Sequence, residues 1–276
     1  MLLLILTIAQ RTKNLFEIYN ELKPKWSGYL GFDGKVIKIH GHRYILLVAV
    51  DLVTLDLVFF KIVKHESKIA IKSFLETIKI RLNFPFKGIV ADLALANIYA
   101  IQDVLPEIPF QGCVVHLERD VNLFILPKYK RTADQKRAKH LFRKVIYARS
   151  KRLAIKAYLE LIKLSKNSND KKITNLVNLI RTNFDYLFVH HKYPFLDRDN
   201  NKTENVINQL NEKFILMKGF KKLTNAYFYI KLITLWYKFK RFETSKDKSK
   251  NGKSPMELSN CKSYPNDWVE FCFKGK

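Results

Sequence analysis

Three carboxylates stand at positions where the fold can bring them together for metal-dependent chemistry. Asp33 lies inside an apolar run, Asp92 ends the short run GIVAD, and Glu204 falls in NNKTENVINQL at the start of a helical pattern. Carboxylate oxygens are the ligands that Mg²⁺ and Mn²⁺ prefer. Two such ions about 4 Å apart generate a nucleophilic oxygen and stabilise charge when a phosphodiester is cleaved or joined. The three acids are therefore the candidate catalytic and metal-ligating residues, with Asp33 expected to bridge two ions.

Each acid also has an ordinary structural interpretation. Asp33 precedes Gly34, and Asp-Gly is a common hairpin turn, although the apolar pattern continues through VIKI and favours a single strand. Asp92 is a candidate N-cap for the helix that follows it. Glu204 would favour the positive end of its own helix whether or not it had a catalytic role. The surrounding elements decide between these interpretations and the catalytic one.

The elements around the acids predict a mixed sheet with helices. Three runs rich in Val, Ile, Leu and aromatic residues predict consecutive antiparallel strands, namely YLGFDGKVIKIHG, RYILLVAVD and LDLVFFKIV. A helical pattern over residues 67–83, the strand GIVAD, a helix over residues 95–104 and a short strand in QGCVVH follow. This order, β-β-β-α-β-α-β, predicts an α/β (α+β) protein with an RNase H-like mixed sheet, in which the first and fourth strands are neighbours.

A lysine-rich helical block separates the second Asp from the Glu. Residues 128–192 hold eighteen Lys and Arg against four Asp and Glu, and they contain no glycine or proline. Such an imbalance leaves few salt-bridge partners and indicates either a solvated face or contact with DNA. We expect five segments: a short N-terminal helical remnant (residues 1–27), the first part of the core (28–127), the all-α insertion (128–196), the C-terminal helices of the core (197–243), and a linker and tail (244–276).

The overall charge indicates a polyanionic partner. The chain has 276 residues and a formal net charge of +25, which a nucleic acid or an anionic membrane would neutralise. The basic residues are spread along the whole chain, which favours nucleic acid. The apolar start MLLLILTIA is too short to span a bilayer and is expected to form a helix. The three cysteines form no disulfide framework, so reduced, intracellular thiols are expected.

Several motifs together resemble the DDE transposases of the Mutator-like and related prokaryotic insertion-sequence group. They are GFDGKVIKI, GIVADLALAN, GCVVH, NNKTENVINQLNEKFILMKGFK, and the tail motifs GKSPMELSN and DWVEF. The resemblance covers Gly28 to the C-terminus. It implies an RNase H-like core with an α-helical insertion, and cleavage and strand transfer of DNA that depend on two Mg²⁺ or Mn²⁺ ions. Carried over by position, Asp33, Asp92 and Glu204 are the catalytic triad.

The same resemblance supplies partners and accessory residues. It implies that the chain binds double-stranded DNA, both transposon ends and target, as a homo-oligomer in the prokaryotic cytoplasm and in association with the nucleoid, with no membrane partner. The CxxH pair of the family falls on Cys113 and His116. We expect Cys113 to be a small buried residue on a strand, and His116 to emerge near Asp92 as an accessory residue. Asn208, four residues after Glu204, shares its helix face and is a third accessory candidate.

Five basic residues are candidate DNA contacts. Lys218, Lys221 and Lys222 follow the helix of Glu204 and are expected to lie near the acids. Lys238 and Arg241 belong to an aromatic-rich helix whose cations and rings suit nucleic acid. The alternative is that these rings face the sheet and the lysines face water.

The N-terminus leaves the function open between three hypotheses. Family members usually carry an N-terminal region that recognises transposon ends, whereas only 27 residues precede the expected core here, so most of that region is expected to be lacking. The first hypothesis is a transposase. The second is a catalytically inactive or truncated remnant that binds DNA. The third is an RNase H-like nuclease or resolvase, which would share the triad but cut without strand transfer.

Overall fold

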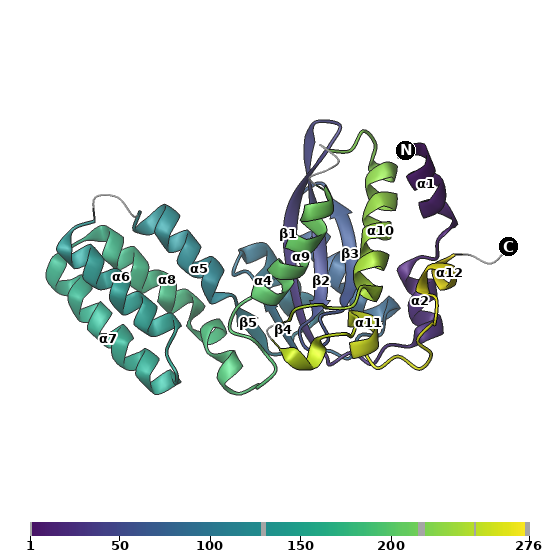
Figure 1. Cartoon of the computed structure of the whole chain (residues 1–276). Helices are drawn as coiled ribbons and strands as arrows, with labels where there is room; N and C mark the ends of the chain where they lie inside the picture. The colour runs from purple at the N-terminus through teal and green to yellow at the C-terminus, as the bar shows by residue number, and fades with distance from the viewer. Residues whose placement is uncertain (1, 128–130, 215–218, 246, 274–276) are drawn as a thin grey trace.

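The computed structural model describes residues 2–127, 131–214, 219–245 and 247–273. It contains a mixed five-stranded sheet with helices on both faces and, beside the sheet, a separate bundle of helices (Figure 1). The predicted α/β class is therefore confirmed.

The sheet has the order β3-β2-β1-β4-β5. Its strands are β1 (Tyr29–Ile39), β2 (His42–Asp51), β3 (Leu57–Val63), β4 (Gly88–Ala91) and β5 (Phe110–Gly112). The first three strands pair antiparallel, while β4 runs parallel to both β1 and β5. The predicted pairing of the first and fourth strands is confirmed.

Strand β1 runs without interruption through Asp33 and Gly34, so these two residues form no hairpin turn. The turn lies instead at His40 and Gly41, whose φ angles of 49° and 78° are both left-handed. Asp33 pairs with Val48 in the middle of the β1–β2 ladder. The catalytic candidate is therefore held by a central strand of the sheet.

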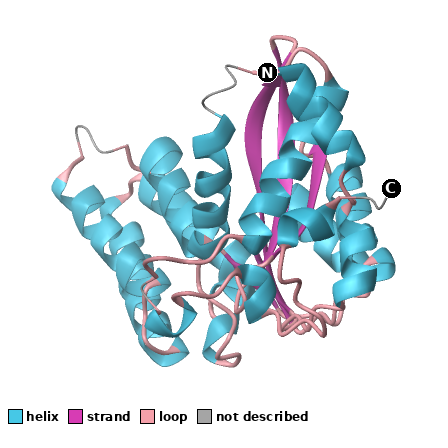
Figure 2. Cartoon of the chain, turned by 45° about the vertical axis from the view of Figure 1, so that its right-hand side comes forward, coloured by secondary structure: helices cyan, strands magenta, loops and turns pink. Residues whose placement is uncertain are grey.

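Helices cover the two faces of the sheet (Figure 2). One face is covered by α2 (Leu15–Leu22), α9 (Asn201–Phe214) and α10 (Leu223–Phe239). The other face is covered by α3 (Lys68–Glu76) and α4 (Leu95–Val104). Helix α3 continues as a π-helical turn (Thr77–Arg81). Side chains alternate along β1, so Ile37 and Ile39 join the first core while Leu30 and Phe32 join the second. By this alternation Asp33 belongs to the face that α9 covers.

The helical bundle has its own hydrophobic core. It comprises α5 (Val114–Asp120) with a π-helical turn (Val121–Ile125), α6 (Ala133–Ile146), α7 (Lys151–Ser168), α8 (Lys171–Leu187) and a 3₁₀ turn (Val189–His191). Side chains of Thr132, Ser150 and Asp170 cap the three long helices.

One predicted strand of this region is present but shorter than expected. The strand expected in QGCVVH ends at Gly112, and α5 begins at Val114. Val114, Leu117 and Val121 are buried at helical spacing and join the core of α6, α7 and α8. The helical core therefore already includes residues that precede residue 128.

The ends of the described chain lie together beside α10. The predicted N-terminal helix is confirmed as α1 (Leu2–Arg11). Lys13 N donates to Cys272 O (2.7 Å), at the last residue of α12 (Trp268–Cys272). The remaining short helices are a 3₁₀ turn (Lys248–Lys250) and α11 (Pro255–Leu258). None of the helices described here is long and apolar enough to cross a bilayer.

Candidate active site

Asn200 fixes the start of α9 against the sheet. Its side-chain Nδ2 donates to Phe32 O (2.7 Å), and its backbone N–H donates to Cys113 Sγ (3.3 Å). Glu204 N in turn donates to Asn200 O (2.9 Å). One buried residue thus links α9 to β1 and to the junction of β5 and α5, and this arrangement delivers Glu204 to the neighbourhood of Asp33.

Gly31 allows the close approach of α9 to β1. A Cβ atom at this position would lie 2.2 Å from Thr203 Oγ1 and 2.7 Å from Asn200 Oδ1. Both distances are well inside van der Waals contact, and both neighbours are fully buried. A side chain at residue 31 therefore requires α9 to move away from the strand.

We predict that Gly31→Ala lowers stability. Overpacking of this kind costs about 1–3 kcal/mol of unfolding free energy. Urea unfolding measures the effect. Adding Thr203→Ala removes the nearer contact and should restore part of the stability. Unchanged stability in Gly31→Ala would contradict the described packing.

The acids meet at the start of α9. Among the described residues, Asp33, His116 and Glu204 form a group whose ligand atoms all lie within 4.8 Å of one another. His116 Nε2 and Arg119 Nη2 lie 3.4 and 3.5 Å from Glu204 Oε1. That carboxylate oxygen is buried and has no hydrogen-bond partner in the described part of the chain. A buried, unsatisfied carboxylate oxygen beside a second carboxylate suits a hard cation.

The electrostatics of the group are those of crowded, partly buried acids. Burial raises the pKa of Asp33, and the Glu204 and Asp92 carboxylates raise it further, while His116 and the Gly34 N–H oppose the shift. The hydrogen bond with Cys113 (Nδ1 to Sγ, 3.1 Å) and the nearby Asp33 and Asp92 raise the pKa of His116 to about 9, although burial opposes this. A His116 protonated at neutral pH lies within ion-pair distance of the Glu204 carboxylate.

Asp92 lies beside this group but is not part of it. It follows β4 directly and interacts electrostatically with Asp33, His116 and Asp120. The alternative interpretation of Asp92 as a helix cap is wrong, because Ala94 is the N-cap of α4 and no side chain caps it. The carboxylate oxygens of Asp33 and Glu204 fit a hard divalent cation, whereas protonated His116 pairs with Glu204 and is no ligand. Asp92 interacts electrostatically with this group.

The comparison with known families agrees with this geometry. The model of the family described as "Transposase, Mutator family" matches residues 21–219, which span β1, the acid group, the helical bundle and α9. The chain belongs to the Mutator family of transposases. A search of curated proteins gives no match. Membership of this family implies that the chain acts on DNA.

One of the accessory candidates of the transposase differs from expectation. Cys113 is buried, as predicted, but it is the N-cap residue of α5 and not part of a strand. Its thiol joins His116 to Asn200, and so to the start of α9. Asn208 is exposed on α9, one turn beyond Glu204.

The expected DNA contacts are scattered over the transposase. Lys218 lies outside the described residues. Lys221 and Lys222 are exposed, but they follow Phe220, whose N–H donates to Lys38 O at the far end of β1, roughly 17 Å along the strand from Asp33. The expectation that they lie near the acids is therefore wrong.

Lys238 is not a DNA contact. Its side chain is fully buried and forms an ion pair with Asp56, because α10 packs its end against the turn between β2 and β3. Arg241, just beyond α10, pairs with Glu257 at 2.8 Å and has an exposed side chain. Both lie toward the end of the sheet opposite to the β1–β2 turn.

Sequence patterns did not reveal three further residues near the acids. Glu66, in the loop between β3 and α3, has a carboxylate oxygen 3.0 Å from the position of a Cβ at Gly34, and burial and the charges of Asp33 and Asp92 raise its pKa. Asp120 at the end of α5 is an electrostatic neighbour of Asp92, and Arg119 pairs with Glu204. No motif marks Glu66, whereas Arg119 and Asp120 follow His116 within one helical turn.

Proposed function

We propose that this Mutator-family transposase cleaves and joins DNA strands at an RNase H-like catalytic core, with Asp33, Asp92 and Glu204 holding two Mg²⁺ or Mn²⁺ ions. The observation that carries the proposal is the meeting of Asp33 and Glu204, which are separated in sequence by the whole helical bundle. The unsatisfied Glu204 oxygen and the raised pKa of Asp33 describe acids that a cation would stabilise.

Three acids would bind the metal, and two basic residues would orient one of these acids. Asp33, from the centre of β1, and Glu204, from the first turn of α9, would bind the metal, and Asp92 would complete the set from the end of β4. Bound divalent metal supplies a nucleophilic oxygen and stabilises charge on the phosphate and the leaving oxygen. Arg119 and protonated His116 lie within ion-pair distance of Glu204 and would orient that carboxylate. This function places the chain on double-stranded DNA, as a homo-oligomer, in the prokaryotic cytoplasm in association with the nucleoid.

Removal of metal tests the proposal. Purified protein is incubated with end-labelled duplex DNA that carries the inverted repeats flanking the coding region. We predict nicking and joining with Mg²⁺ or Mn²⁺, complete loss with EDTA, and recovery when metal is added in excess. Cleavage without joined products would favour an RNase H-like nuclease. DNA binding that is indifferent to metal, with no cleavage, would contradict the proposal and favour a binding remnant.

A further inference from the structure

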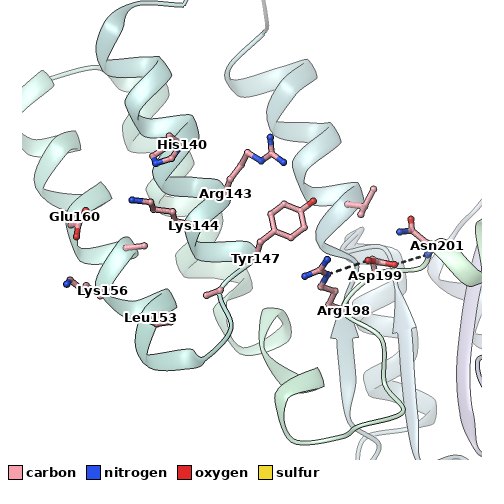
Figure 3. A pocket seen from close by; sticks show the side chains of 13 residues that line it. His140, Arg143, Lys144, Tyr147, Leu153, Lys156, Glu160, Arg198, Asp199 and Asn201 are labelled. Atoms are coloured by element: carbon pink, nitrogen blue, oxygen red, sulfur yellow. Dashed lines mark hydrogen bonds and ion pairs between the residues drawn. The ribbon is translucent and has the colours of Figure 1, made fainter.

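A large cavity separates the helical bundle from the segment that leads into α9. Its volume is about 1020 Å³, at the upper end of the range of ligand-binding pockets. Figure 3 shows Arg143, Lys144 and Tyr147 from the end of α6, with Lys156 from α7 on one side and Arg198 on the other. The cavity belongs to neither the sheet nor the acid group.

Positive charge dominates the lining. Four Lys and Arg side chains border the cavity against two acids, Glu160 and Asp199. Arg143 shares Glu118 with Lys139, and Arg198 Nε lies 3.7 Å from Asp199 Oδ2, yet the arginine side chains remain 60% and 51% exposed. Lys144 and Lys156 are exposed and form no ion pair within the described chain. Unneutralised cations around one cavity indicate an anionic ligand.

Tyr147 organises the two arginines. The guanidinium groups of Arg198 and Arg143 lie 5.1 and 5.7 Å from the centre of its ring, within cation–π distance. Its hydroxyl donates to Glu118 Oε2 (2.8 Å) and so fixes the ring. The planar guanidinium groups are thus pre-positioned to donate to two oxygens of one phosphate.

Two of the chain segments that border the cavity also carry residues of the acid group. Asn201, which borders it, is the first residue of α9, and Glu204 follows within one turn of about 5.4 Å. Val115, also in the lining, precedes His116, and Val114 N donates to Arg198 O (3.2 Å). The same two helix starts therefore border both the cavity and the acids.

We propose that this cavity binds the phosphate backbone of the DNA strand that continues from the acid group, with Lys144, Lys156 and Arg198 as its phosphate contacts. This inference rests on the proposed function, because a strand cleaved at Asp33 and Glu204 must leave the acids along a neighbouring surface. The helical bundle, which lies between Asp92 and Glu204 in the sequence, would then contact DNA.

A charge-matched pair of double variants tests the inference. Lys144→Gln with Lys156→Gln removes two cations from the cavity, while Lys171→Gln with Lys172→Gln removes two exposed cations from the start of α8, beyond the far end of α7. Binding to a labelled duplex is measured over a range of salt concentrations in metal-free buffer, where cleavage does not interfere. Circular dichroism confirms that each variant folds.

The two variants should differ in salt dependence. The logarithm of the binding constant falls with the logarithm of the salt concentration, and each lost phosphate contact makes this slope less steep by about 1. The slope of the cavity variant should therefore be less steep by about 2. The slope of the α8 variant should stay close to that of the unmodified protein. Equal slopes for the two double variants would overturn the inference. Failure of the proposed function would appear separately, as absence of cleavage in the unmodified protein.

Discussion

Replacement of Glu204 by Gln is expected to lower the rate of DNA cleavage on the order of a thousandfold, the size of effect seen when one group that stabilises transition-state charge is lost. Glutamine keeps the shape of the side chain and removes the negative charge that would hold a metal ion. The change weakens the ion pairs of Glu204 with His116 and Arg119, but the buried residues that pack α9, among them Val206, Ile207 and Leu210, are untouched, so the helix should stay in place. Time courses with end-labelled duplex and Mg²⁺ measure the effect.

Glu212→Gln is the matched control for this experiment. Glu212 lies on the same helix, is exposed, and is separated from the acid group by two turns. The same chemical change there should leave the cleavage rate unaltered. Full activity in Glu204→Gln, or an equal loss in both variants, would exclude Glu204 from the catalytic role proposed for it.

Replacement of Lys238 by Met is expected to lower the free energy of unfolding by about 3–5 kcal/mol, the cost of breaking a buried ion pair from one side. Lys238 Nζ pairs with Asp56 and also donates to Tyr19 Oη (2.8 Å) and Leu57 O (3.0 Å). Trp26 Nε1 remains as a donor to the second Asp56 oxygen (2.9 Å). Methionine removes the cation that pairs with Asp56. Burial raises the pKa of this carboxyl group, so its charged form would be left in the protein interior without the group that stabilises it.

Urea unfolding measures this loss. Two further variants show whether the loss comes from burial of the pair and from the unpaired charge. Arg241→Gln breaks the exposed pair with Glu257 just beyond the same helix and should change stability little, since solvent screens such pairs. Combining Lys238→Met with Asp56→Asn removes both charges and should recover part of the loss. A Lys238→Met protein as stable as the original would show that the pair is not buried as described.

Much of the fold follows from periodicity in the sequence. The alternation of apolar residues along YLGFDGKVIKI predicts one strand that passes through Asp33, and the stripe Val206, Ile207, Leu210 and Phe214 predicts the buried face of α9. Both are confirmed, because burial on one face imposes these periods locally. The meeting of Asp33 with Glu204 depends on the order of the strands within the sheet. The order of strands and helices along the chain also indicates that arrangement.

Other features depend on distant packing and have no local signal. Lys238 looks like a cation on a basic helix, and its burial follows only from where α10 ends against the loop that carries Asp56. Val114 and Leu117 extend an apolar run after β5, and such a short run fits a strand or a helix equally well until the bundle core is known. Glu66 lies near the acids because the loop after β3 returns to Gly34, and no spacing in the sequence reveals this.

The most direct test of the proposed site is the binding of Mn²⁺ to the protein, followed by electron paramagnetic resonance. It requires no knowledge of the DNA sequence on which the transposase acts. The account predicts that the unmodified protein and Glu212→Gln bind Mn²⁺ alike, whereas Asp33→Asn and Glu204→Gln each lose that binding. Equal binding of Mn²⁺ by all four proteins would contradict the claim that Asp33 and Glu204 hold the metal.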